Sequence, residues 1–106
     1  MTLRRTLFAS MIALTGLNST AFGADANTIV IKNFDFAPMT LTVKTGDTVT
    51  WKNEDGEPHT VTSDTGLFRS GGLDQDDSFS FKFDKPGTYA YVCSIHPKMV
   101  GKIVVK

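Results

Sequence analysis

From Thr28 onward, the chain consists of short runs of alternating apolar and polar residues separated by turn residues. The clearest run is Phe79-Ser80-Phe81-Lys82-Phe83, where an aromatic residue occupies every second position. A period of two is typical of a half-buried β-strand, and no long segment of this region has the period of a helix. We therefore expect β-structure throughout, with the aromatic face of this strand in the core.

The remaining runs are short strands of the same kind. Ile29 to Lys32 begins a first strand, which the stretch leading to Pro38 ends because proline cannot donate to a sheet ladder. Leu41 to Val43 and Val49 to Trp51 flank the turn Gly46-Asp47, and this predicts a hairpin with Trp51 in the core. Each of these runs is too short and too regular in its alternation for a helix.

The last third of the chain places its single cysteine on an inward face. Tyr89, Tyr91 and Cys93 share one parity after the turn Lys85-Pro86-Gly87, so Cys93 is expected to point into the core. Residues 64–77 have little periodicity and predict a loop along one edge of the sheet. Seven short strands without crossover helices predict an all-β domain over residues 28–106, a small antiparallel Greek-key β-sandwich.

The N-terminal segment has the pattern of a secretory signal peptide. Arg4 and Arg5 precede an apolar run from Leu7 to Leu17, and small residues lead to Gly23. We expect a signal peptide over residues 1–23, with an alternative cleavage site after residue 26. The apolar run is shorter than the ~20 residues that cross a bilayer, so no membrane anchor is expected after cleavage. This predicts an exported, periplasmic protein.

The charge of the mature chain argues against nucleic acid as a partner. Cleavage after Gly23 removes two of the 11 basic residues and none of the 11 acidic ones, which leaves a net charge of −2. Phosphate binding depends on clustered lysine and arginine, and the chain has no such cluster.

The segment from Cys93 to Met99 places a thiol, an imidazole and a thioether in one short turn. Thiolate and thioether are soft ligands, and together with the imidazole of His96 they favour copper or zinc over magnesium or calcium. Zinc sites use cysteine, histidine and carboxylate, whereas two histidines, one cysteine and a weak axial methionine form a blue-copper site. His59 is the only other histidine in the chain. An unpaired cysteine could instead be a buried structural thiol, an intermolecular disulfide or a nucleophile.

Pro58-His59, followed by Cys93-x2-His96-x2-Met99, resembles the cupredoxins, and the spacing of the last three residues resembles their amicyanin branch. The resemblance implies one type 1 copper ion at one end of a sandwich, with His59 inside and His96 at the surface. It also implies that both histidines bind through Nδ1. Met99 would then be the long axial contact.

By the same resemblance, the protein is a blue-copper electron carrier and not an enzyme, because the four ligands leave no open coordination position. The expected partners are redox proteins of the dehydrogenase, cytochrome c or oxidase type, and the carrier is expected to be a monomer. A periplasmic copper carrier that exchanges its ion is one alternative. A thiol hydrolase, with Cys93 as nucleophile and His96 or His59 as base, is another.

Two positions depart from the amicyanin pattern. Thr60 stands where the family usually has asparagine, and its hydroxyl can still brace the ligand loop. Ile95 stands where many members have proline, and it restores a backbone N–H that can point at the Cys93 sulfur.

Overall fold

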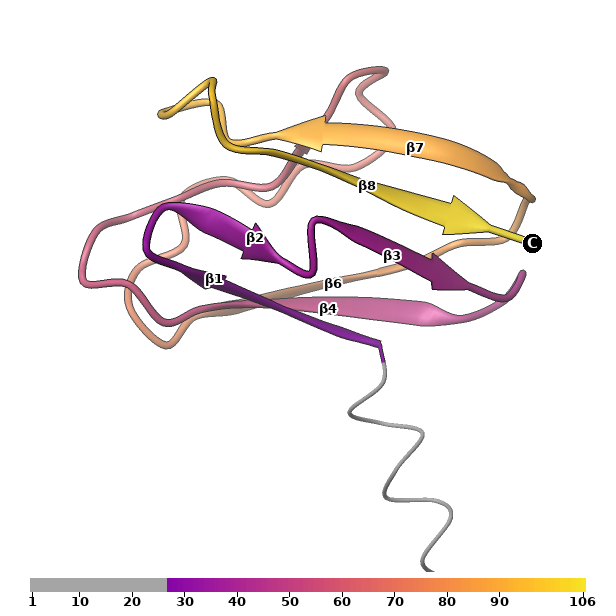
Figure 1. The fold of residues 1–106 in the computed structure, drawn as a ribbon, viewed down its shortest axis with the longest axis horizontal. Helices are drawn as coiled ribbons and strands as arrows, with labels where there is room; N and C mark the ends of the chain where they lie inside the picture. The colour runs from indigo at the N-terminus through magenta and orange to yellow at the C-terminus, as the bar shows by residue number, and fades with distance from the viewer. Residues whose placement is uncertain (1–26) are drawn as a thin grey trace, which may run out of the picture.

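The computed structural model describes residues 27–106, so the predicted signal peptide and its cleavage sites lie outside the described residues (Figure 1). Residues 27–106 contain eight β-strands and no helix. Within the same residues, no helix is therefore long and apolar enough to cross a membrane.

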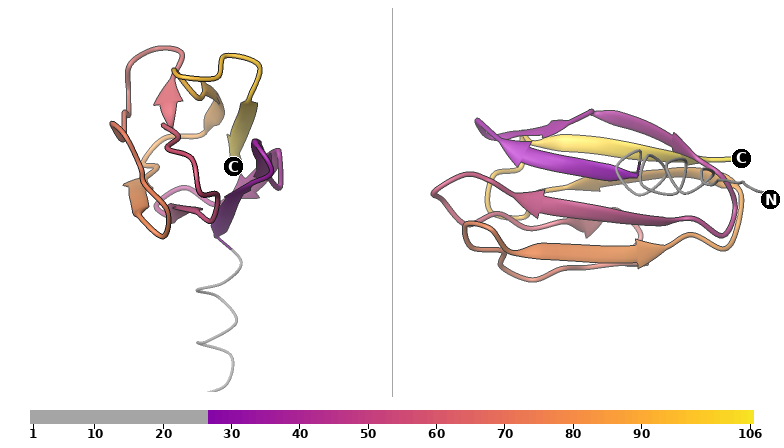
Figure 2. Two further views of the ribbon diagram at one scale, coloured as in Figure 1. Left: turned by 90° about the vertical axis from the view of Figure 1, so that its left-hand side faces the viewer. Right: turned by 90° about the horizontal axis from the view of Figure 1, so that it is seen from below.

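The eight strands form two four-stranded sheets that pack face to face (Figures 1 and 2). The first sheet has the order β2 (Asp35–Ala37), β1 (Thr28–Lys32), β4 (Thr48–Asn53) and β6 (Ser78–Lys82). The second has the order β3 (Thr40–Val43), β8 (Val100–Val105), β7 (Gly87–Val92) and β5 (Thr62–Ser63). The predicted all-β sandwich is confirmed. Each sheet also contains one parallel pair, β1 with β4 and β3 with β8, so the sheets are mixed and not purely antiparallel.

The core lies between the sheets, where the inward positions of the strands meet. Trp51 and Phe83 are buried, and the half-buried Phe79 and Phe81 pack against the same cluster, as the alternation predicts. The core consists of Ile29, Ile31, Phe36, Val43, Val49, Trp51, Val61, Phe68, Leu73, Phe83, Tyr91, Cys93, Met99, Ile103 and Val105.

The hairpin predicted across Gly46-Asp47 is wrong. β3 and β4 belong to different sheets, so the segment between them crosses from one sheet to the other. Amides of this crossing segment donate hydrogen bonds to residues directly after β8 and β6, one strand from each sheet. Thr45 N donates to Lys106 O at 3.0 Å, and Gly46 N donates to Phe83 O at 2.6 Å. Gly46 has φ +95°, a conformation that favours glycine. Alternation predicts which face is buried but not which strand is the neighbour, so a crossing turn and a hairpin turn have the same pattern.

The first strand ends at Lys32, directly before the stretch that is predicted to break it. Asn33 and Phe34 have φ values of 55° and 60°, which turn the chain back so that β2 pairs with β1. The segment that was expected to break the strand is therefore a short edge strand. Pro38 lies just beyond it, where no ladder hydrogen bond is lost.

Residues 64–77 close the side of the sandwich between β5 and β6, as the sequence predicts for an edge loop. Phe68 and Leu73 are buried, and the Phe68 ring stacks on Trp51 at 5.7 Å between centroids. The loop also forms two isolated bridges, between Leu73 and His59, which precedes β5, and between Arg69 and Thr62, the first residue of β5.

Candidate metal centre

The loop from Cys93 to Met99 connects β7 to β8 at the end of the sandwich where the β1–β2 turn also lies (Figure 1). Cys93 N donates to Met99 O at 3.0 Å, and Met99 N donates to His96 O at 2.9 Å, so the loop closes on itself. Cys93 and Met99 are buried, while His96 is half-buried. The inward orientation predicted for Cys93 is confirmed.

His59 reaches the same place from the segment between β4 and β5. Its backbone pairs with Leu73 in both directions, at 3.0 Å and 2.7 Å, and its side chain is fully buried. Its Nδ1 lies 3.9 Å from the Cys93 sulfur. The fold therefore brings together a thiol and an imidazole that are 34 residues apart, with Nδ1 facing the sulfur.

Asp55 fixes the other side of the His59 ring. Its Oδ2 lies 2.8 Å from His59 Nε2, and its two oxygens also accept hydrogen bonds from Asn33 N at 2.7 Å and Phe34 N at 3.0 Å. Burial raises the pKa of Asp55, but these amide bonds and the contact with His59 together lower it below its usual value. An ionised carboxylate can only accept, so in the neutral ring Nε2 carries the proton and Nδ1 presents its lone pair towards Cys93.

Asn53 holds the loop that carries Asp55. Its fully buried side chain donates from Nδ2 to Glu57 O and Leu73 O, each at 2.9 Å, and its Oδ1 accepts from Asp55 N at 2.9 Å. A buried amide with all of these bonds made adds rigidity without leaving an unpaired polar group.

The Cys93 sulfur lies among hydrogen-bond donors. Thr60 N donates to the sulfur at 3.3 Å. Burial raises the pKa of the Cys93 thiol, but the amide of Thr60, the His59 ring and the amides of His96 and Ile95 together lower it. The net effect favours the thiolate, which is the form that binds metals.

The brace expected from Thr60 is confirmed. Ser94 N donates to Thr60 Oγ1 at 2.8 Å, and the hydroxyl oxygens of Thr60 and Ser94 are 2.9 Å apart. A threonine can therefore tie the His59 segment to the ligand loop in the absence of an asparagine.

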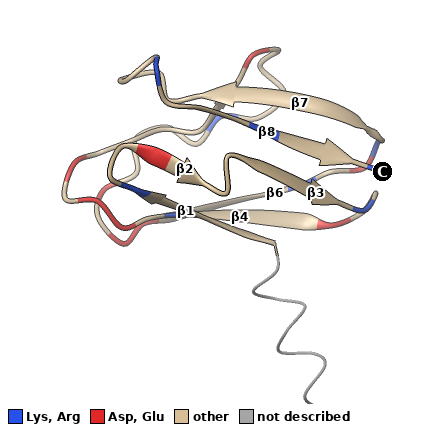
Figure 3. Cartoon of the chain, in the orientation of Figure 1, with Lys and Arg blue, Asp and Glu red and all other residues tan. Residues whose placement is uncertain are grey.

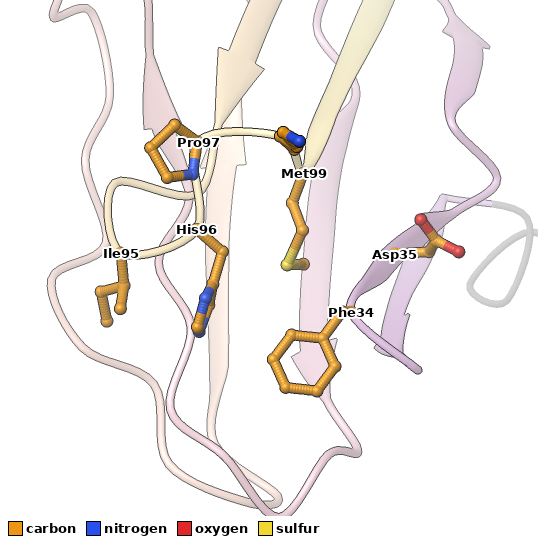
Figure 4. A pocket seen from close by; sticks show the side chains of 7 residues that line it. Phe34, Asp35, Ile95, His96, Pro97 and Met99 are labelled. Carbon is orange, nitrogen blue, oxygen red and sulfur yellow. The ribbon is translucent and has the colours of Figure 1, made fainter.

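His96 lies at the surface of this assembly, in a groove lined by Phe34, Asp35 and residues 95–99 (Figure 4). Its ring centroid is 5.1 Å from that of His59. Across residues 27–106, no three His, Cys, Asp and Glu side chains form a group that could hold a metal ion on their own. The potential ligands that the structure arranges as a set are His59, Cys93 and Met99, with the His96 ring beside them.

Two residues of this site were not identified from the sequence. In the sequence, Asp55 has the pattern of a polar turn, Glu54-Asp55-Gly56-Glu57, although its position four residues before His59 is a usable signal. Phe34, which lines the groove, belongs in the sequence to the stretch that ends the first strand. Nothing in its neighbourhood in the sequence indicates a contact with either histidine.

The cupredoxin-like domain family matches residues 6–105 of the chain. The chloroplastic plastocyanin of Tetradesmus obliquus is 38% identical over 97 residues, which cover 79% of this chain and 63% of the plastocyanin, just under two thirds. Amicyanin-alpha of Methylorubrum extorquens is 36% identical over 93 residues, which cover 78% of this chain and 74% of that protein. Among solved structures, the reduced Cu(I) form of an amicyanin variant has a TM-score of 0.71 and 33% identity, and the match covers 74% of this chain and 80% of that one.

Proposed function

The chain belongs to the cupredoxin family, and from this we propose that it is an exported blue-copper electron carrier. One copper ion would be held by His59, Cys93, His96 and Met99. One thiolate, two imidazoles and one thioether are the set of ligands that blue-copper sites use, so the residues present fit this ion.

The observation that carries the proposal is the pairing of His59 and Cys93. The two side chains are fully buried, with Nδ1 3.9 Å from the sulfur. Asp55 and Thr60 hold this pair by hydrogen bonds to the outer side of the ring and to the sulfur. When bound, copper supplies a one-electron couple between Cu(I) and Cu(II). The protein's part is to keep the ligands in place in both oxidation states, which reduces the reorganisation that accompanies electron transfer.

The exit for the electron would be His96, which is the ligand closest to solvent. Around it lie the exposed side chains of Phe34 and Ile95. Acidic residues of the loops after β4 and before β6 gather at the same end of the molecule (Figure 3). A redox partner of the dehydrogenase, cytochrome c or oxidase type would therefore present an apolar patch flanked by basic residues. The periplasm would be the location, and the carrier would act as a monomer.

Two other functions are less well supported. A thiol hydrolase needs a nucleophile that a substrate can reach, and Cys93 and His59 are each 0% exposed. A copper carrier must exchange its ion, which a ligand pair fixed by buried hydrogen bonds does not favour. Retention of copper against a chelator distinguishes a carrier of electrons from a carrier of copper.

The test is copper loading of the wild type and of Cys93→Ser. The wild type is expected to bind one copper ion and show an intense visible thiolate-to-copper band, which the serine variant lacks. Met99→Leu, which removes the thioether, is compared with Met39→Leu, an exposed methionine outside the ligand loop. A wild type that binds only colourless zinc when copper is supplied, or a serine variant that keeps the band, refutes the proposal.

A further inference from the structure

Phe34, at the tip of the β1–β2 turn, contacts both imidazoles of the proposed site. Its ring centroid lies 5.1 Å from that of His59, with an interplanar angle of 90°. The centroid of His96, whose ring is drawn beside Phe34 in Figure 4, is 5.0 Å away, with an angle of 83°. Both arrangements are T-shaped, the geometry in which aromatic rings attract one another beyond the burial of their surfaces. One side chain from the β1–β2 turn thus contacts the buried His59 and the half-buried His96 together.

Hydrogen bonds to Asp55 hold the turn that carries Phe34. Asn33 and Phe34 both have positive φ, and the Asp55 carboxylate accepts a hydrogen bond from each of their amides. The same carboxylate bonds to Nε2 of His59. The turn, the carboxylate and the buried imidazole therefore form one hydrogen-bonded unit, which places the backbone of Phe34 relative to His59.

The His96 ring, in contrast, has few constraints. It is half-buried, and in the part of the chain that the structure describes its ring nitrogens make no hydrogen bond to protein. The loop around it is held through its backbone, by the bond from Met99 N to His96 O and the bond from Cys93 N to Met99 O. Contacts with neighbouring rings must then determine where the His96 ring lies.

We propose that Phe34 is a positioning residue, which the Asp55-bound turn holds against both imidazoles so that His96 keeps its place beside Cys93 and Met99. This inference rests on the proposed copper site for its consequence in the loaded protein. In the metal-free protein, Phe34 already orders the His96 ring, and this part of the inference does not depend on copper.

The first experiment measures the rate at which Cu(I) is lost to bathocuproine disulfonate. Phe34→Leu, which keeps an apolar side chain but removes the ring, is expected to lose copper about two- to tenfold faster than the wild type. Phe34→Tyr, which restores a ring, is expected to stay within about twofold of the wild type. Leu67→Ala is the matched control, because Leu67 is exposed to a similar extent, 50% against 45%, and lies outside the groove.

The second experiment uses NMR on the metal-free proteins. The wild type is expected to show nuclear Overhauser effects between the Phe34 ring and both histidine rings, and Phe34→Leu is expected to show a broadened His96 ring with unchanged signals in the β-strands. Equal rates of copper loss in Phe34→Leu and Leu67→Ala, with the blue band intact, overturn the inference and leave the copper site standing. If the wild type shows no blue band with copper, the proposed function fails. The role of Phe34 is then tested by the metal-free protein alone, where ring contacts with both histidines support it and their absence contradicts it.

Discussion

Replacement of Ile95 by proline would remove one backbone N–H beside the Cys93 sulfur and leave the four proposed ligands in place. The amide of Ile95 is one of the groups that lower the pKa of Cys93, so it stabilises negative charge on the sulfur. A donor at the sulfur withdraws electron density from the thiolate and weakens its donation to copper. Because Cu(II) depends on that donation more than Cu(I), the donor raises the reduction potential, and its removal should lower it.

The size of the shift follows from the rank of Ile95 among the donors. Thr60 N forms a hydrogen bond to the sulfur at 3.3 Å, whereas Ile95 has the smallest effect of the groups that lower the pKa of Cys93. A full hydrogen bond to a charged group contributes ~1.5 to 3 kcal/mol, and 1.5 kcal/mol corresponds to about 65 mV for a one-electron couple. We therefore expect Ile95→Pro to lower the potential by about 20 to 60 mV.

Voltammetry of the copper-loaded proteins at one pH and one ionic strength measures this shift. Ile95→Ala is the matched control, because it removes the same side chain and keeps the N–H. Its potential is expected to stay close to that of the wild type. A potential in Ile95→Pro that equals or exceeds that of Ile95→Ala, with the blue band preserved in both, would falsify the reasoning, since the Ile95 amide would then have no effect on the sulfur.

Three further predictions concern stability and are measured by urea unfolding of the metal-free protein. Gly101→Ala should destabilise the protein by ~1 to 3 kcal/mol, because the new Cβ would lie 2.5 Å from Cζ of the buried Tyr91 and closer still to its hydroxyl. Gly56→Ala, with open space around the new Cβ, should be nearly neutral. Tyr91→Phe should leave stability unchanged or raise it, because the buried hydroxyl makes no hydrogen bond of good geometry within residues 27–106, with Trp51 as its one weak contact. A loss above ~1 kcal/mol would indicate a bonded hydroxyl. Asp55→Ala should destabilise the protein most above pH 3.8, the ordinary pKa of aspartate, because the pKa of Asp55 is lowered in the folded state. The loss should become smaller as the pH falls through this lowered pKa. A loss that grows at acid pH would contradict an ionised Asp55.

The faces of the strands could be predicted from the sequence, because alternation depends only on which side of a sheet meets the core. Trp51, Phe83 and Cys93 are buried for this reason. The pairing of strands could not be predicted in the same way. β3 and β4 have the alternation of a hairpin, but their partners lie far along the chain, and the parallel pair of β3 with β8 joins segments near opposite ends of the domain.

For the site, the types and spacing of the candidate ligands were informative because a thiol, two imidazoles and a thioether have few uses together. The meeting of His59 with Cys93 was expected, and the structure brings the two within 3.9 Å. The residues that hold the ligands could not be predicted from the sequence, since Phe34 lies in a turn whose position depends on the fold of both sheets. Asp55 has its role only because the turn at Asn33 lies over it.

Asn53 has a consequence for how a protein of this kind can change over evolutionary time. Its side-chain amide donates hydrogen bonds to the carbonyls of both Glu57 and Leu73, so one side chain holds the loop after β4 and the loop before β6. An insertion that moved either carbonyl would leave a buried amide hydrogen unpaired and would shift the Asp55 carboxylate as well. We expect the lengths of these two loops to change together across relatives, while the exposed turn at Gly56 is free to vary in composition.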